Sequence, residues 1–198
     1  MEWSEYLTKR IKHVESLGVK VLLSPVEYKT IEGNFPCRGY FCSETKELFV
    51  AGLAEGWKEV FIHETCHVDQ WAEGDWLWDA ASGDLAIAFD KYLEGEIDMS
   101  PDDLDLAAKI CGALELDCDS RAVQEMENND LPFDISEYIQ KSNAYYLQYP
   151  LMAALGKAHK PGKAPSQVKE VYSCLPKTFI VEQDIPAEFL IKALRCCY

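Results

Sequence analysis

The segment from Glu55 to Trp71 constrains the fold most, because its apolar residues are spread around the whole circumference of one expected helix. Its apolar and functional side chains are Trp57, Val60, Phe61, Glu64, Cys66, Val68 and Trp71. A surface helix carries a single apolar stripe, whereas a helix that is apolar on most sides is buried. We therefore expect residues 55–71 to form a central helix on which the rest of the chain packs.

The residues before this helix predict strands, with one helix at the start of the chain. Residues 3–17 have apolar positions at helical spacing, and Gly18 then stops the helix. Residues 19–23 are β-branched and apolar, which is typical of a strand. Turn residues follow at 32–36. Residues 39–42 and 47–51 are expected to pair as a hairpin around a turn at 43–45.

The residues after it predict mainly helices. Ser100 followed by Pro101 and two acids is a strong helix start, since Ser caps the N-terminus and Pro fits the first turn. The expected elements are two or three helices within 83–128, helices over 135–156 and 186–195, and a short final strand over 179–181. Strands early and helices late predict an α+β fold. The length fits one domain over residues 1–198.

Charge and hydropathy exclude some classes of partner. The net charge is −15, and acidic residues far outnumber Lys91, Lys109 and Arg121 between positions 73 and 130. Such a surface repels phosphates, so nucleic acid is not an expected partner. The charge either serves solubility or attracts a basic protein. No apolar run approaches the roughly 18 residues that a membrane span needs, so no membrane partner is expected.

The cysteines indicate a reducing compartment. There are eight, and none forms a Cys-x-x-Cys pair, which argues against a zinc ribbon. The first residues lack the basic start and apolar stretch of a signal peptide. We therefore expect a cytoplasmic, non-secreted protein with reduced thiols rather than disulfides.

The central helix carries His63-Glu64-Thr65-Cys66-His67. Two histidines four residues apart project from the same face of a helix, so both rings can bind one ion. Glu64 lies beside them, where its carboxylate can take a proton from a metal-bound water. The alternative is a pair of core histidines, but two buried imidazoles and a glutamate would all need polar partners.

This motif resembles that of the zincin metallopeptidases, and the likeness extends over residues 38–125. The resemblance implies a small mixed or antiparallel sheet packed on the His-Glu-x-x-His helix, with an edge strand that pairs with a peptide. The metzincin branch would need Gly and His where this chain has Gln70 and Glu73, so that branch is excluded. The chain is more similar to the gluzincins, and in style to small phage or bacterial members.

In gluzincins the third ligand is a Glu on a later helix, commonly followed four residues on by an Asp. Glu115 and Asp119 match this pattern, although their interval from His67 is longer than in thermolysin-like members. The resemblance thus implies that Glu115 binds zinc and that Asp119 accepts a hydrogen bond from a ligand histidine. Asp69, two residues from His67, should point away from the metal. Glu115 as a solvated helix acid remains the alternative.

Residues that support catalysis are selected only by type. A donor for the developing oxyanion could come from Tyr145, Tyr146, Tyr149 or His159, although tyrosines at helical spacing usually pack in a core. Three tryptophans follow the motif and could line an apolar subsite or pack in the core; they are Trp71, Trp76 and Trp78.

The sequence therefore predicts a zinc-dependent hydrolase, most simply a peptidase with Glu64 as general base and a peptide or protein substrate. Two other functions stay open. One is a zinc-binding interaction protein without activity, which would have no use for Glu64. The other is an acidic binding or inhibitor protein without metal. The oligomeric state is not predicted.

Overall fold

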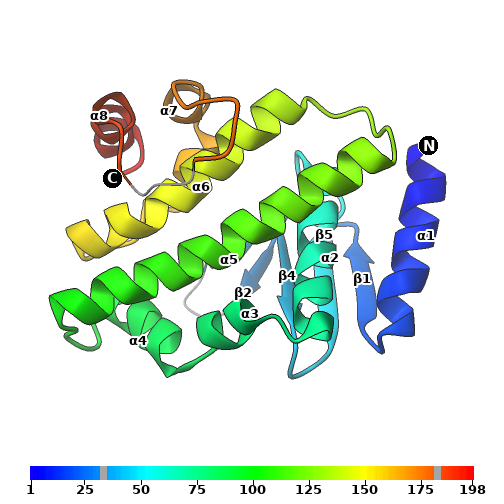
Figure 1. Cartoon of the computed structure of the whole chain (residues 1–198), viewed down its shortest axis with the longest axis horizontal. Helices are drawn as coiled ribbons and strands as arrows, with labels where there is room; N and C mark the ends of the chain where they lie inside the picture. The colour runs from blue at the N-terminus through cyan, green and yellow to red at the C-terminus, as the bar shows by residue number, and fades with distance from the viewer. Residues whose placement is uncertain (32–34, 181–183) are drawn as a thin grey trace. The chain divides into compact units, whose positions relative to one another are not determined.

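The computed structural model describes residues 1–31, 35–180 and 184–198. These residues, drawn in colour in Figure 1, divide into two compact units. The first unit comprises Met1–Asp75 and Arg121–Phe133, and the second comprises Trp76–Ser120 and Asp134–Tyr198. Helix α5 (Pro101–Asn128) contributes residues to both. A small sheet early in the chain followed by helices confirms the α+β class, whereas the single domain stays a prediction.

A mixed three-stranded sheet forms the first unit's scaffold. Its order is β1 (Lys20–Ser24), β5 (Glu47–Ala51), β4 (Gly39–Cys42). Strand β1 runs parallel to β5, and β4 runs antiparallel to it. The expected hairpin is confirmed, with Cys42 opposite Glu47 and Gly39 opposite Val50. Because β5 is central, its residues 48–51 are almost fully buried, which explains their uninterrupted apolar character.

A second, two-stranded ladder was not expected from the sequence. Strand β2 (Lys29–Ile31) pairs antiparallel with β3 (Phe35–Cys37). The turn expected at 32–36 is therefore wrong for residues 35 and 36, and residues 32–34 lie outside the described residues. Pro36 suggested a turn because it cannot donate to a sheet, but a two-stranded ladder has edges that tolerate proline.

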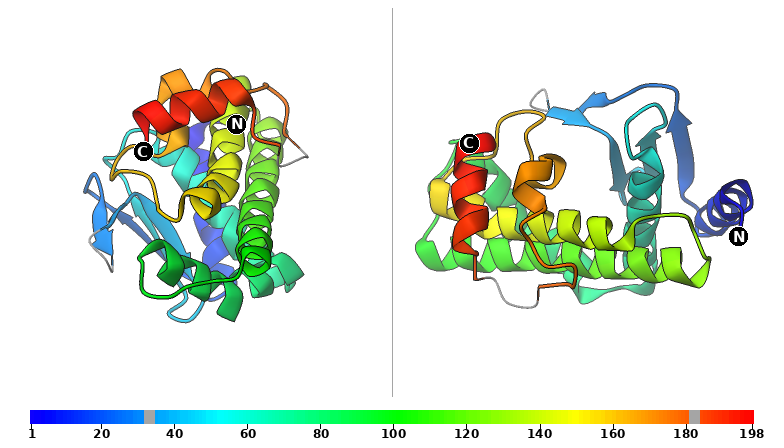
Figure 2. Two further views of the ribbon diagram at one scale, coloured as in Figure 1. Left: turned by 90° about the vertical axis from the view of Figure 1, so that its left-hand side faces the viewer. Right: turned by 90° about the horizontal axis from the view of Figure 1, so that it is seen from above.

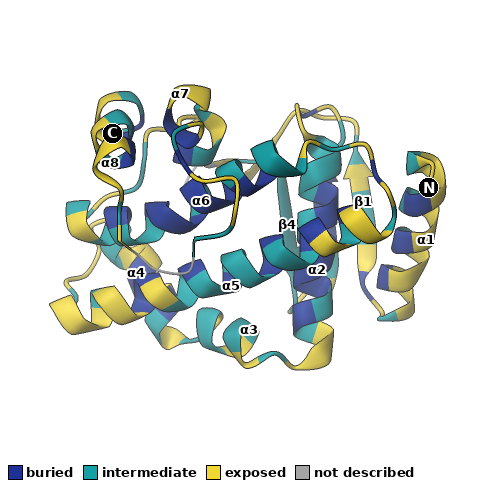
Figure 3. Cartoon of the chain, turned by 45° about the horizontal axis from the view of Figure 1, so that its top comes forward, coloured by how far each residue is buried: buried dark blue, intermediate teal, exposed yellow. Residues whose placement is uncertain are grey.

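Two helices pack beside this sheet. Helix α1 (Trp3–Ser16) contacts β1 and α2, and α2 (Trp57–Glu73) contacts β4 and β5 (Figure 2). Gly18 ends the first helix with a φ of 81°, as its position predicted. Buried residues run along α2, which confirms that most of this helix is covered (Figure 3).

The end of α5 completes the first unit. Arg121 pairs with Glu73 at 2.6 Å and with Asp75 at 3.0 Å, both at the C-terminal end of α2. One turn further on, Glu125 accepts a hydrogen bond of 3.3 Å from the Tyr6 hydroxyl of α1. These contacts tie residues 121–128 to both packed helices.

The second unit is helical. Its elements besides α5 are α3 (Trp76–Ala81), α4 (Asp84–Leu93), α6 (Ile135–Leu155), a 3-10 turn at Pro165–Gln167, α7 (Lys169–Tyr172) and α8 (Ala187–Cys196). The Ser100 cap is confirmed, since Ser100 Oγ accepts from the Asp103 amide at 3.2 Å. Among the described residues, none of the helices combines the length and apolar character that crossing a bilayer requires.

The segment after α7 is held by a helix side chain rather than by a sheet. Residues 179 and 180 are not in a strand, so that part of the expected final strand is wrong, and residue 181 lies outside the described residues. The fully buried Asn143 of α6 donates to the carbonyls of Pro176 at 3.0 Å and Thr178 at 2.9 Å. Its Oδ1 accepts from the Ile180 amide at 3.0 Å. One amide thus replaces the backbone ladder that a strand would have.

We expect Asn143→Ala to lower the free energy of unfolding by about 1–3 kcal/mol or more, because it leaves backbone groups of residues 176–180 without their partner. Chemical denaturation measures this loss. Asn128→Ala, at an exposed position of α5, is the control and should change stability by less than about 0.5 kcal/mol. Equal stabilities of the two variants would contradict the role given to Asn143.

Candidate metal centre

Helix α2 presents the His-Glu-x-x-His residues on a well-defined backbone. The helix starts after Gly56, whose φ is 74°, and it ends at Gly74, whose φ is 67°. The Gly74 amide bonds to the Trp71 carbonyl at 3.1 Å, and the Asp75 amide bonds to the Gln70 carbonyl at 3.0 Å. This pair of bonds is a Schellman motif, which satisfies the last carbonyls of the helix. The motif residues therefore lie within a regular helix rather than at a fraying end.

His63 and His67 lie side by side on one face of α2. Their ring centroids are 4.7 Å apart, and the ring planes are nearly perpendicular at 88°. His67 is 7% exposed, whereas His63 is more accessible. The structure therefore brings the two predicted ligands together, as the spacing of one helical turn requires.

The orientation of His67 is fixed by Gln70, a residue that the sequence analysis did not assign to the site. The Nδ1–H of His67 donates to Oε1 of Gln70 over 2.8 Å, and Gln70 is fully buried. Because Nδ1 carries the proton, Nε2 keeps the lone pair that a metal ion needs. The sequence could have identified Gln70, because a residue three positions after His67 lies beside it on a helix.

Glu64 is buried against the start of strand β4. It is 8% exposed, and a Cβ built on Gly39 would lie 3.0 Å from its Cγ and 3.1 Å from its Oε1. The same Cβ would lie 2.4 Å from Val60 Cγ1, closer than real contacts allow. Only glycine lets the strand approach the helix this closely, so Gly39 is part of the wall around the Glu64 carboxylate.

Cys37 lies in the electrostatic field of this carboxylate. Burial raises the pKa of the Cys37 thiol, and the negative charge of Glu64 raises that pKa further. The thiol donates to the Gly39 carbonyl at 2.8 Å. A thiol held protonated in this way is a weak nucleophile and a weak metal ligand. All eight cysteines are free.

The predicted third ligand and its supporting acid belong to the second unit. Glu115 of α5 accepts a long hydrogen bond of 3.5 Å from the Tyr149 hydroxyl. Asp119, one turn later and 5% exposed, accepts a bond of 2.6 Å from the Tyr138 hydroxyl. Both acids therefore face tyrosines of α6, and their parts in a metal site stay predictions.

The residues proposed to stabilise an oxyanion occupy packed or peripheral positions in the second unit. Tyr146 is 5% exposed and packs against Gly112 of α5, where an added Cβ would lie 3.1 Å from its ring. Tyr145 and Tyr149 stack edge to face with centroids 5.9 Å apart, and burial raises the pKa of Tyr149. His159 bonds to the neighbouring Lys160 carbonyl at 3.0 Å. Their catalytic role stays a prediction.

Two tryptophans near the motif have different environments. Trp71, at the end of α2, packs its ring 5.6 Å from that of Phe41 in β4. Trp76 is 69% exposed on α3, a helix whose residues are all at least partly exposed. Trp71 thus belongs to the packing between helix and sheet, whereas Trp76 does not serve as core.

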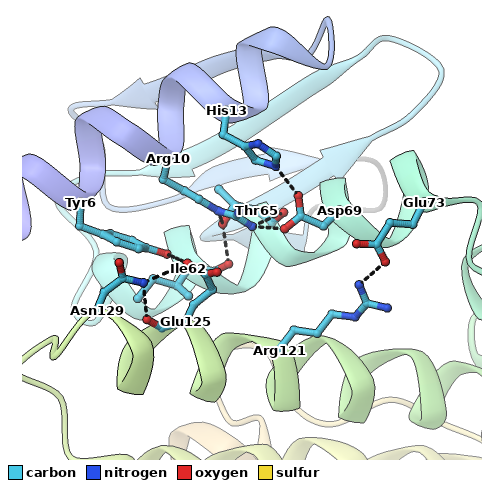
Figure 4. Close-up of polar contacts among 10 residues, drawn as sticks. All are labelled: Tyr6, Arg10, His13, Ile62, Thr65, Asp69, Glu73, Arg121, Glu125 and Asn129. Atoms are coloured by element: carbon cyan, nitrogen blue, oxygen red, sulfur yellow. Dashed lines mark hydrogen bonds and ion pairs between the residues drawn. The ribbon is translucent and has the colours of Figure 1, made fainter.

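Asp69 points away from the histidines, as its position predicted. Its carboxylate binds Arg10 and accepts a bond of 2.8 Å from His13 Nε2, both on α1 (Figure 4). A residue two positions from His67 lies about 200° around the helix, which places it on the opposite face. Asp69 is therefore engaged by α1.

Comparisons of the chain with protein-family models, with curated proteins and with solved structures found no match. The interpretation of the site thus rests on the residues and their geometry.

We expect Gly39→Ala to destabilise the protein by about 1–3 kcal/mol, because the added methyl group overlaps Val60 and presses on Glu64. Thermal or chemical denaturation measures the loss. The double variant Gly39→Ala/Val60→Ala removes the closest contact and should recover more stability than the two single losses predict when added. Additive losses would show that the close approach of β4 to α2 is not the cause.

Proposed function

We propose that the protein is a zinc-dependent hydrolase, most simply a peptidase, whose reaction takes place at the His63–Glu64–His67 face of α2. One observation supports this proposal most directly. The ring centroids of His63 and His67 are 4.7 Å apart, and the buried Glu64 is next to His63 in the chain. The hydrogen bond from His67 Nδ1 to Gln70 supports the proposal, because it selects the tautomer of His67 that binds an ion through Nε2.

The donor set fits zinc. Two imidazoles and one further anionic ligand form the usual catalytic site, which leaves a position for water. His63 and His67 would hold the ion, and Gln70 would keep His67 in the tautomer that binds through Nε2. When bound, zinc would supply a Lewis acid that polarises the scissile carbonyl and acidifies water.

Glu64 would act as the base. Its side chain is 8% exposed and lies close to Gly39, so water is largely excluded around it and its orientation is restricted. An Oε atom of Glu64 would accept the proton of the attacking water and then pass it to the leaving amine nitrogen of the peptide. The carboxylate is regenerated at the end of each cycle.

The substrate proposed is an extended peptide. Strand β4 lies at the edge of the three-stranded sheet, and its first residue, Gly39, lies so near Glu64 that an added Cβ would press on that side chain. A peptide that pairs with this edge would gain backbone hydrogen bonds without any demand on its sequence. Its scissile bond would then pass close to Glu64.

A third ligand is proposed to come from α5, and two residues compete for it. Glu115 matches the gluzincin pattern. Cys118 lies one turn before Ala122 and two turns before Met126, and all three are fully buried on one face of the helix. A cysteine thiolate is a strong zinc ligand, which makes Cys118 a serious alternative to Glu115.

The function is tested first with Glu64→Gln. Wild-type protein should bind about one zinc per chain by elemental analysis and hydrolyse an unfolded protein substrate. Glu64→Gln should keep the zinc and lose more than about 100-fold in kcat, because the amide cannot accept the proton. His63→Ala should lose both zinc and activity. A wild-type protein that stays metal-free when refolded with zinc would end the proposal.

The third ligand is identified by comparing Glu115→Gln with Cys118→Ser. The variant that lacks the true ligand should bind zinc far more weakly, whereas the other should stay close to wild type. Asp119→Asn should show an intermediate loss of about 10–100-fold if Asp119 orients a ligand histidine. Cys111→Ser is the matched control on the same helix, since burial raises the pKa of Cys111 to about 12 and makes it a poor ligand. Wild-type zinc affinity in both Glu115→Gln and Cys118→Ser would place the ligand elsewhere.

A further inference from the structure

Helix α2 carries two pairs of polar residues that interleave along its sequence. His63 and His67 are one turn apart, and so are Thr65 and Asp69. Because the pairs are offset by two residues, they lie on roughly opposite faces of the helix, about 160° apart. One face is that of the proposed metal site, and the other faces α1.

The face toward α1 is held by a single side chain. Arg10 Nε donates to Thr65 Oγ1 at 2.9 Å, and its NH2 group donates to the Thr65 carbonyl at 3.1 Å. The same NH2 group also donates to the Asp69 carboxylate (Figure 4). The guanidinium therefore binds two residues of α2, Thr65 and Asp69, that are one helical turn apart. Both residues lie on one side of the axis of α2, so a rotation of the helix would move both away from the guanidinium.

The acceptors of Arg10 are themselves oriented. Thr65 is fully buried, and its hydroxyl donates to the Ile62 carbonyl at 2.8 Å, so its oxygen lone pairs are directed at Arg10. The second oxygen of Asp69 is bound by His13 at 2.8 Å, one turn along α1 from Arg10. Each group thus has a specific partner, and a rotation of α2 in either direction would break several bonds together.

Burial makes this arrangement costly to disturb. Arg10 is 8% exposed. Burial lowers the pKa of its guanidinium, but the neighbouring groups, with Asp69 first among them, together raise the pKa above its ordinary value. The side chain therefore stays charged, and a buried charge needs its partners. A hydrophobic contact between α1 and α2 would tolerate sliding or rotation, whereas this directional set does not.

We propose that Arg10 is a positioning residue that fixes the rotation of α2, and with it the direction in which His63, Glu64 and His67 face. The inference rests on the proposed function of these three residues. Arg10 acts through the opposite face of the helix, by means of Thr65 and Asp69.

The test compares Arg10→Met with Lys12→Met. Both remove one positive charge from α1, but Lys12 is exposed. In folded protein, we expect Arg10→Met to lose about tenfold or more in zinc affinity, with a fall in kcat at nearly constant KM, and Lys12→Met to match wild type. Arg10→Lys should be intermediate, because one ammonium cannot reach all three acceptors. A purely structural role would lower the free energy of unfolding without changing zinc affinity or kcat of the folded fraction.

A metal-free measurement separates failure of this inference from failure of the proposed function. In zinc-free protein, the ring proton signals of His63 and His67 in NMR spectra should move in Arg10→Met and stay in place in Lys12→Met. If Arg10→Met does not fold, Thr65→Val removes one acceptor with little change of shape and should move the same signals less. A wild-type protein that binds no zinc would contradict the proposed function but not the role of Arg10. Unmoved histidine signals in the folded Arg10 or Thr65 variant overturn the role of Arg10.

Discussion

The first unit depends on the burial of polar groups along α2. A central helix normally presents apolar side chains to its neighbours, yet here Glu64, Thr65, His67 and Gln70 are all buried. Each such group costs free energy unless it finds a hydrogen-bond partner. Arg10 supplies partners for Thr65, and Gln70 and His67 satisfy each other. The packing of the unit therefore has to satisfy these polar groups as well as bury apolar area.

These partners also give the helix a defined rotation. Apolar contacts with β4 and β5 bring α2 onto the sheet, but they are not directional. The bonds from Arg10 are directional and lie opposite the histidine face. Strand β4 also approaches α2 closely at Gly39, next to Glu64, and this contact limits how far the helix can shift. A site whose reacting groups must be held within a fraction of an ångström needs this kind of support.

In the second unit, too, polar side chains bind backbone groups of another segment. The segment at residues 176–180 has no strand partner among the described residues, and the amide of Asn143 binds its backbone instead. Gln140, on the preceding turn of α6, bonds to the carbonyls of Ser173 and Leu175 in the same way. Helix side chains can thus bind the backbone of an irregular segment at the protein surface.

The sequence by itself determined the local elements and the histidine pair. Helical spacing, the Gly18 stop, the Ser100 cap and the hairpin at 39–51 depend on neighbouring residues, so they were predictable, and the same holds for His63 and His67 one turn apart. Only the tertiary structure decided the rest. Arg10 and Thr65 are 55 positions apart, and nothing local marks them as partners. The β2–β3 ladder, the approach of Gly39 to Glu64 and the binding of residues 176–180 by Asn143 likewise arise when distant segments meet, because the free energy of a buried polar group depends on what surrounds it in space.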